Sequence, residues 1–230
     1  MSELDQAVHT VIRRCLGVLP DETVVVVADE ATRALGDALQ ARSAELAQLL
    51  TEADEAHITC PRGTDLELDL TGREGISDDG DLTGERAFGN LPCGEGFVSP
   101  AGGEGRMVTA SLAGIGLPRG APPALTMRDG RLIEADEPEG EQLLAALLAA
   151  GEQGTNLAEL GIGTNERATL TGNILEDEKI LGTVHLAFGA SAGIGGTVSV
   201  PVHLDCLVAE PTLDVGGTRV LERGRFVLDA

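Results

Sequence analysis

The first sixty residues show two helical patterns of apolar positions on either side of a continuous apolar run. Residues 4–16 and 30–50 place apolar side chains at helical spacing. Between them the sequence TVVVVAD, at 23–29, is a β-branched run typical of a strand that is buried on both faces. ADEAHITC, at 53–60, predicts a second, parallel strand, so this order of elements indicates a small α/β unit.

After this unit the pattern changes to short apolar or alternating runs separated by Gly, Pro and Asp, which predicts a mostly antiparallel β region. A helix is expected at EQLLAALLAA, bounded by Gly140 and Gly151, and a second short helix near 157–160. The predicted fold class is therefore α+β, with a small α/β unit over residues 1–60 and a β-rich domain over residues 61–230. The runs expected to form strands are TDLELDL, RMVTASLAGI, ALTMRD, RLIEAD, LGTVHLAFG, GTVSVPVHLDCLVA, PTLDVGG and RVLERGRFVL.

Acidic residues outnumber basic ones by 38 to 16, which gives a formal net charge of −22 at neutral pH. Such a charge repels nucleic acid phosphates and anionic lipid head groups, so we expect neither nucleic acid nor a membrane as a partner. The acidic residues are spread along the chain, as in the solvated surfaces of halophilic proteins, although an acidic mesophilic enzyme has a similar composition. Lys179 is the only lysine, and all other basic residues are arginines.

No sequence signal indicates export or membrane insertion. The N-terminus has early acidic residues and no long apolar run before a small-residue cleavage site, and no stretch reaches the length of a membrane span. We therefore expect a cytoplasmic protein. The four cysteines, at positions 15, 60, 93 and 206, lack CxxC spacing, so neither a zinc ribbon nor a disulfide framework is expected.

Candidate chemistry appears in the strand-like sequences of the last third. In VPVHLDCLV, His203 and Asp205 are two residues apart, so both side chains project from one face of the predicted strand. A surface pair or a hydrogen-bonded couple would show the same spacing as a metal site. His185, in LGTVHLAFG, is flanked by apolar residues and is either a core imidazole or a metal ligand, since burying an imidazole without a partner is costly.

Two carboxylates lie in apolar surroundings beside glycines that let the backbone approach a ligand closely: Glu95 in NLPCGEGFVSP and Glu159 in NLAELGIGTN. Taken singly, either is equally well explained as a solvated carboxylate. Taken together with the histidines, they give three carboxylates and two imidazoles, a set that suits divalent Zn, Co, Mn or Fe(II) and can bridge two such ions. The predicted metal site consists of Glu95, Glu159, His185, His203 and Asp205.

Two further motifs do not indicate a cofactor. GIGTN lacks the spacing of the phosphate loop and of the dinucleotide-binding loop, so no nucleotide site is expected. ILEDEKI, at 174–180, predicts a solvated acidic turn. Its lysine, Lys179, leaves a structural ion pair or a substrate contact open as alternatives.

Several of these sequences together resemble one family. NLPCGEGFVSP, AELGIGTN, ILEDEKILGTVHLAFG, GIGGTVSVPVHLD and the earlier GTDLELDL are similar, in the same order, to motifs of the M29 metallopeptidases of the aminopeptidase T and S type. The resemblance covers most of residues 60–215. It implies an α/β N-terminal domain, a β-rich catalytic domain that binds metal, a homodimer, and the removal of N-terminal residues from small peptides.

By this resemblance the five residues of the predicted site fall on the ligands of a two-metal centre with Zn, Co or Mn. The metals of the family hold the peptide and activate water. A carboxylate such as Glu95 would also serve as the catalytic base.

The chain departs from the family in two ways. The family has a catalytic Tyr a few residues after the His of GTxH, but this chain contains no Tyr, and its N-terminal part is shorter than usual. The same fold family includes 2,5-dihydroxypyridine dioxygenases, in which His185, His203 and Asp205 would hold one Fe(II) that acts on a small aromatic molecule. A dioxygenase and a metal-binding relative without catalysis therefore stand as alternatives to the aminopeptidase.

Overall fold

The computed structural model describes residues 31–80, 89–90 and 92–228. The helix predicted at 4–16 and the strand predicted at TVVVVAD lie outside the described residues. Within the described part the chain forms two sheets and three α-helices, which confirms the α+β class. No helix of this part is both long and apolar enough to cross a lipid bilayer.

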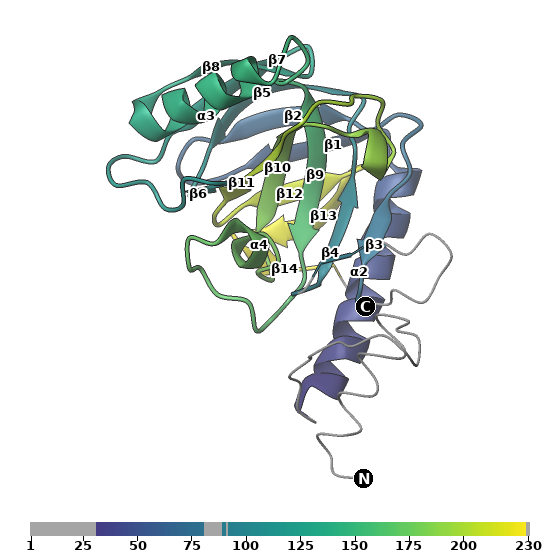
Figure 1. The fold of residues 1–230 in the computed structure, drawn as a ribbon. Coiled ribbons are helices and arrows are strands. Elements are labelled where there is room, and N and C mark those ends of the chain that lie inside the picture. The colour runs from purple at the N-terminus through teal and green to yellow at the C-terminus, as the bar shows by residue number, and fades with distance from the viewer. Residues whose placement is uncertain (1–30, 81–88, 91, 229–230) are drawn as a thin grey trace, which may run out of the picture.

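Both sheets are built from antiparallel pairs (Figure 1). The eight-stranded sheet has the order β14 (Arg225–Phe226), β13 (Thr218–Glu222), β12 (Thr212–Val215), β1 (Glu55–Thr59), β2 (Asp65–Asp69), β5 (Gly102–Val108), β7 (Ala124–Arg128), β8 (Arg131–Ala135). The six-stranded sheet has the order β3 (Ile76–Asp78), β4 (Glu95–Val98), β9 (Leu157–Gly163), β10 (Val184–Gly189), β11 (His203–Val208), β6 (Ser111–Leu112).

The hydrophobic core lies between the two sheets. Val184 and Leu186 of β10 belong to the same buried cluster as Ile58 of β1 and Leu66 of β2. In Figure 1 the yellow strands β12 and β13 lie behind β9 and β10. Because successive side chains of a strand point to opposite faces, His185 projects from the face of β10 that is turned away from this core.

Three helices pack on the sheets. α2 (Ala31–Glu52) contacts β3 and β4, and α3 (Glu137–Ala149) contacts β7 and β8. The one-turn helix α4 (Ile174–Asp177) contacts β6 and β11 and lies in front of the six-stranded sheet in Figure 1. The segment that contains α4 therefore covers the face that carries His185, while the eight-stranded sheet covers the other face.

The strand predicted at 53–60 exists as β1, but its predicted parallel pairing is wrong. β1 pairs with β2 and with β12, and both pairs are antiparallel. Only the turn at 60–64 separates β1 from β2, and so short a connection permits an antiparallel hairpin and no crossover. The predicted domain boundary at residue 60 stays a prediction, because residues 1–30 lie outside the described part.

The short helix predicted near 157–160 is also wrong, since Leu157–Gly163 forms strand β9 and is buried on both faces. Such a strand shows no two-residue alternation, so periodicity does not separate it from a buried helix. The helix predicted at EQLLAALLAA is confirmed as α3, although Gly140 lies inside it, and the helix at 30–50 is confirmed as α2. Each of the eight runs predicted to form strands contains all or part of at least one strand.

Replacing Leu186 by Ala tests the packing between the sheets. Leu186 is fully buried in the core cluster, so we expect the free energy of unfolding to fall by about 2–5 kcal/mol in urea denaturation. Leu148→Ala is the control, because Leu148 lies on α3 with 60% of its surface exposed and its loss should stay within about 0.5 kcal/mol. Equal losses in the two variants would contradict a core between the sheets.

Candidate metal centre

The five predicted ligands come from four neighbouring strands of the six-stranded sheet. Glu95 lies on β4, Glu159 on β9 and His185 on β10, and β11 carries His203 and Asp205. The segments that contain them are far apart in the sequence, and the sheet places them next to one another. The structure therefore brings all five predicted residues to one place.

Strand register puts their side chains on one face. Glu159 of β9 and Asp205 of β11 both pair with Ala187 of the strand between them. Residues that pair across strands share a face, and so do residues two apart in one strand. His185 and His203 therefore point to the same face as the two carboxylates, and Ala187, between Glu159 and Asp205, adds only a methyl group to that face.

The glycines of AELGIGTN make room for what lies over β9. A methyl group on Gly161 would come within 2.1 Å of ring atoms of His185, and one on Gly163 within 2.2 Å of the carbonyl oxygen of Ile180. Gly161 thus lets the imidazole lie across β9 beside Glu159. Gly163 lets the chain that follows α4 pack directly on the sheet. The motif GIGTN therefore has a steric role in the site.

Glu159 stands between the two imidazoles. Its Oε1 lies 3.3 Å from Nε2 of His185, and its Oε2 lies 3.2 Å from Nε2 of His203. Nε2 of His185 is also 3.3 Å from Oε2 of Glu95, and Nε2 of His203 is 3.5 Å from Oδ1 of Asp205. One carboxylate thus links two clusters of nitrogen and oxygen atoms.

The outer imidazole is held in the orientation of a metal ligand. Nδ1 of His203 donates a hydrogen bond to the carbonyl oxygen of Ala190 at 2.7 Å, which leaves Nε2 facing the carboxylates. Metal-binding histidines are commonly oriented through such a bond. At the inner end, Oε2 of Glu95 and Nδ1 of His185 are buried and have no hydrogen-bond partner among the described residues.

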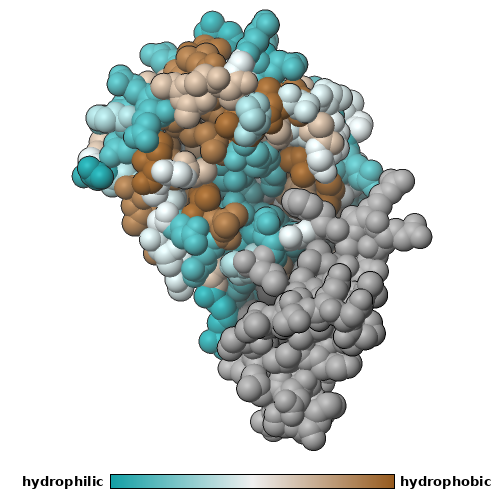
Figure 2. Space-filling view, viewed as in Figure 1, coloured by the Kyte–Doolittle hydropathy of each residue, from teal (hydrophilic) through white to brown (hydrophobic). Residues whose placement is uncertain are grey.

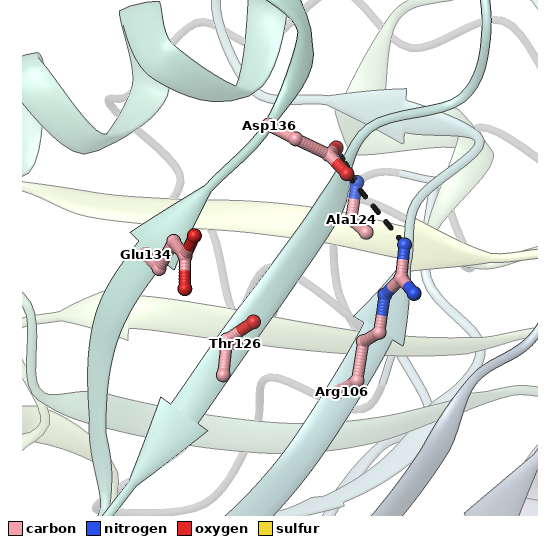
Figure 3. Close-up of a pocket in the computed structure, with 5 residues that line it drawn as sticks. All are labelled: Arg106, Ala124, Thr126, Glu134 and Asp136. Atoms are coloured by element: carbon pink, nitrogen blue, oxygen red, sulfur yellow. Dashed lines mark hydrogen bonds and ion pairs between the residues drawn. The ribbon is translucent and has the colours of Figure 1, made fainter.

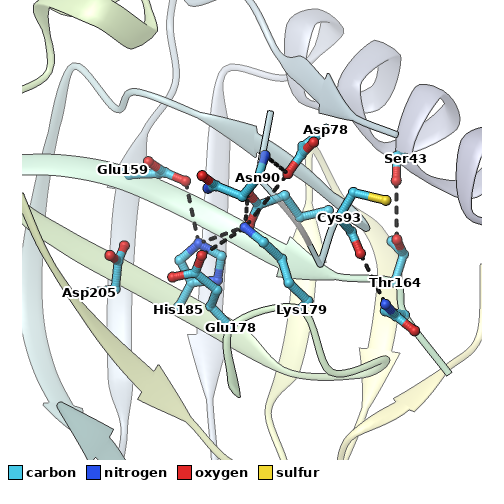
Figure 4. A network of polar contacts seen from close by, with 12 residues as sticks. Ser43, Asp78, Asn90, Cys93, Glu159, Thr164, Glu178, Lys179, His185 and Asp205 are labelled. Atoms are coloured by element: carbon cyan, nitrogen blue, oxygen red, sulfur yellow. Dashed lines mark hydrogen bonds and ion pairs between the residues drawn. The ribbon is translucent and has the colours of Figure 1, made fainter. Parts of the chain in front are cut away.

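A lysine and two acidic residues that were not predicted as site residues lie beside the predicted ligands. The ammonium of Lys179 donates to Oε1 of Glu95, lies 2.7 Å from Oε1 of Glu178 and 3.8 Å from Oδ2 of Asp78 (Figure 4). Asp78, Glu178 and Lys179 are all buried. The solvated turn predicted at ILEDEKI is therefore wrong, and the structural ion pair that had been left open is present; its signal in the sequence was the single lysine.

Asp177 fixes the segment that carries this lysine. Its carboxylate accepts hydrogen bonds from the backbone N–H groups of Thr171 and Gly172 and from the hydroxyl of Ser111 on β6. Asp177 is fully buried. These bonds tie α4 both to the loop before it and to the edge of the sheet, so Glu178 and Lys179 have a rigid support.

Electrostatics keep the imidazoles protonated when no metal is bound. Burial alone lowers the pKa of His185, but its hydrogen bond with Glu159 and the charge of Glu95 raise that pKa to about 9. Burial likewise lowers the pKa of His203, and its contacts with Asp205 and Glu159 raise that pKa to about 11. Burial raises the pKa of Glu159, yet the two imidazoles lower it to about 2.

The carboxyl groups around Lys179 behave differently. Burial raises the pKa of Glu178 to about 7, against the opposing charge of His185. Burial also raises the pKa of Glu95 and of Asp78, and the charge of Lys179 opposes both shifts. Burial lowers the pKa of Lys179 itself, but the charges of Glu95 and Glu178 raise it above its usual range, so the lysine remains a cation.

The donor atoms meet the chemical requirements of a divalent metal. Three groups of three side chains each have ligand atoms within 4.8 Å of one another. Carboxylate oxygens and imidazole nitrogens suit zinc and similar divalent ions. The three groups are Glu95 with Glu159 and His185, Glu159 with His203 and Asp205, and Glu178 with His185 and Asp205.

Among the described residues, the centre is most exposed at the end that carries His203 and Asp205. The side chain of His203 is 32% exposed and that of Asp205 is 13% exposed, whereas His185 and Lys179 are at or below 1%. A molecule from solvent therefore meets His203 first. The shallow pocket in Figure 3 lies elsewhere, over β5, β7 and β8, and is lined by none of the predicted ligands.

Cys206 does not belong to the site. It is a buried member of the core cluster and lies on β11 next to Asp205, so its side chain projects from the opposite face of the strand. Burial raises the pKa of its thiol well above the usual value.

Comparison with known proteins identifies relatives of this fold. The model of a family described as thermophilic metalloprotease (M29) matches residues 22–219. The solved structure of 2,5-dihydroxypyridine dioxygenase from Pseudomonas putida is similar with a TM-score of 0.75 and 18% identity, over 85% of this chain and 60% of that one. AmpT from Thermus thermophilus is similar with a TM-score of 0.66 and 25% identity, over 86% of this chain and 55% of that one. No curated protein matches the sequence.

The chain thus corresponds to 55–60% of the length of these two structures. The likeness to the dioxygenase, at 18% identity, concerns the fold alone. The roles of the individual site residues are not tested by these comparisons and stay predictions.

The metal-free protein should lose stability as the pH rises. A histidine whose pKa is raised by folding stabilises the protein fully below its unfolded pKa, and this contribution is lost as the pH passes its folded pKa. For His185, whose pKa moves from 6.5 to about 9, the free energy of unfolding should fall by roughly 3 kcal/mol across this window. Folding also raises the pKa of Glu178 from 4.5 to about 7, so its contribution to the free energy of unfolding falls as the pH rises between these two values. Urea denaturation in the presence of a chelator measures this, and stability that increases above pH 6.5 would refute it.

Replacing Gly161 by Ala should displace the imidazole of His185. The added methyl group would overlap the ring, so we expect the free energy of unfolding to fall by about 1–3 kcal/mol in urea denaturation. Gly102→Ala is the control, since Gly102 also lies in a strand and a methyl group there meets no atom within 4 Å. If both variants lose the same amount, the close approach of His185 to β9 is not required.

Proposed function

The chain belongs to the M29 family of metalloproteases, and on this basis we propose that it is a metal-dependent aminopeptidase that removes N-terminal residues from small peptides. The observation that carries the proposal is the meeting of three carboxylates and two imidazoles on one face of the six-stranded sheet. Zn, Co or Mn bound by these residues would polarise the scissile carbonyl and lower the pKa of water.

We assign roles to the residues of the centre from their exposure to solvent and their positions. His203 and Asp205 lie at the more exposed end, where the N-terminus of a peptide would arrive. Glu159 presents one oxygen to each imidazole and is suited to bridge two ions. His185 supports the inner end from β10, with its Nε2 between Glu95 and Glu159.

We assign the role of general base to Glu95. Lys179 holds Oε1 of this carboxylate, so the remaining oxygen, Oε2, faces the centre near His185. Burial raises the pKa of Glu95, and a raised pKa brings a carboxylate closer to the proton affinity that base catalysis at neutral pH requires. The side chain is paired with a lysine and is thus less free than the sequence had suggested.

The absence of Tyr sets an expectation for the rate. The resemblance to M29 peptidases implies a phenol that stabilises the tetrahedral intermediate, and this chain has none. Loss of one such donor commonly lowers kcat by about 10²–10³. We therefore expect slow hydrolysis of peptides. The homodimer and the cytoplasmic location also stay predictions.

Aminoacyl p-nitroanilides with added Co or Zn provide the test. We expect metal-dependent release of nitroaniline that a chelator abolishes, and His203→Asn should lower the rate at least tenfold if it removes a metal ligand. His57→Asn is the matched control, since His57 lies on β1 of the other sheet, is exposed and pairs only with Asp65 among the ion pairs of the described residues.

The result also separates the alternatives. Turnover of 2,5-dihydroxypyridine with Fe(II) and oxygen, without hydrolysis of the anilides, would replace the aminopeptidase by a dioxygenase. No turnover in either assay by a protein that still binds metal would indicate a relative without catalysis. Equal rates for His203→Asn and His57→Asn would remove His203 from the mechanism.

A further inference from the structure

Glu178 is placed to take part in the metal centre. We propose that it is a sixth metal ligand, which donates a carboxylate oxygen to a divalent ion together with His185 and Asp205. The inference rests on the metal centre proposed above and extends it by a residue from outside the sheet. Glu178 directly follows α4, so a bound ion would link the segment that covers the site to the sheet.

The geometry of the three side chains fits a common ion. One carboxylate oxygen of Glu178, one of Asp205 and one ring nitrogen of His185 lie within 4.8 Å of one another. Ligands that bind an ion at about 2.0–2.2 Å are themselves separated by up to roughly 4.4 Å. Small side-chain adjustments therefore bring all three donors to ligand distance.

Neighbouring groups hold Glu178 in this position. Lys179 binds its Oε1 at 2.7 Å, and a carboxylate has a second oxygen with which to reach the centre. The hydrogen bonds of Asp177 with Thr171, Gly172 and Ser111 fix α4, which directly precedes Glu178, to the loop before it and to β6. Figure 4 shows Glu178 beside His185.

The balance of charge at this end calls for a further cation. The carboxylates of Asp78, Glu95 and Glu178, all of them buried, share the ammonium of Lys179, and the imidazolium of His185 faces Glu159 as well as Glu95. Buried carboxylates without compensating cations are costly. In addition, Nδ1 of His185 is buried without a hydrogen-bond partner among the described residues, and Oε2 of Glu95 has only its ion-pair contact with His185, so both atoms retain capacity to bind a further group.

A pair of matched variants separates ligation from charge. Glu178→Gln and Asp78→Asn each remove one negative charge from a buried carboxylate beside Lys179, but only Glu178 belongs to a possible metal-binding group. Affinities for Zn and Co are measured by competition with a chromophoric chelator, and the visible absorption of the Co(II)-loaded protein reports the ligand set. Thermal unfolding of the metal-free variants checks that both fold.

We expect Glu178→Gln to weaken binding of one ion at least tenfold and to shift the Co(II) bands, since even partners of ligands matter by about 10–100-fold. Asp78→Asn should leave the bands in place and change affinity by much less. Equal effects in both variants, or unchanged bands in Glu178→Gln, would overturn the proposal.

Two further results keep the conclusions distinct. If Glu178→Gln does not fold, Glu178→Asp keeps the charge but withdraws the oxygen by one methylene, and the same shift of the Co(II) bands is expected; unchanged bands would refute ligation. A wild-type protein that takes up no ion overturns the proposed function as well. Normal metal binding by the wild type with no effect of Glu178 substitutions removes only the sixth ligand.

Discussion

The structure depends on how it balances carboxylates that are withdrawn from water on one face of a sheet. Five of them gather within a short distance of one another, with one ammonium and two imidazoles as the cationic groups of the described site. Isolated buried charges are costly, so each of these groups is tolerable only because of its neighbours. The carboxylates are Asp78, Glu95, Glu159, Glu178 and Asp205.

The sheet makes this balance possible because its backbone hydrogen bonds are formed between strands and do not use the side chains of the site. In β9 and β10 the N–H and C=O groups are paired with neighbouring strands, so the side chains of one face are free to be polar while the other face packs in the core. The small residues Gly161, Gly163 and Ala187 then leave room for the polar groups that lie over the sheet. The acidic groups can approach one another because the sheet offers no bulk between them.

Much of this site could be predicted from the sequence, for identifiable reasons. His203 and Asp205 are two apart in a strand, and their common face follows from strand geometry alone. Glu95, Glu159 and His185 were selected from their apolar, glycine-rich surroundings, and the resemblance then supported their grouping, because strand register cannot be read from separate short motifs. Glu178 was missed and Lys179 was left open as an ion pair, since a run of charges predicts solvent exposure and the burial of both residues results from tertiary packing over Gly163. The same limit explains β9, whose burial on both faces hides its alternation.

The position of the only lysine has a practical consequence for handling the protein. Acylating reagents act on accessible primary amines, and Lys179 has no surface in contact with solvent. In the folded chain such reagents have no lysine side chain to modify. Acylation of Lys179 therefore requires local or global unfolding that exposes its amine, and the acylation rate would measure how often such unfolding occurs.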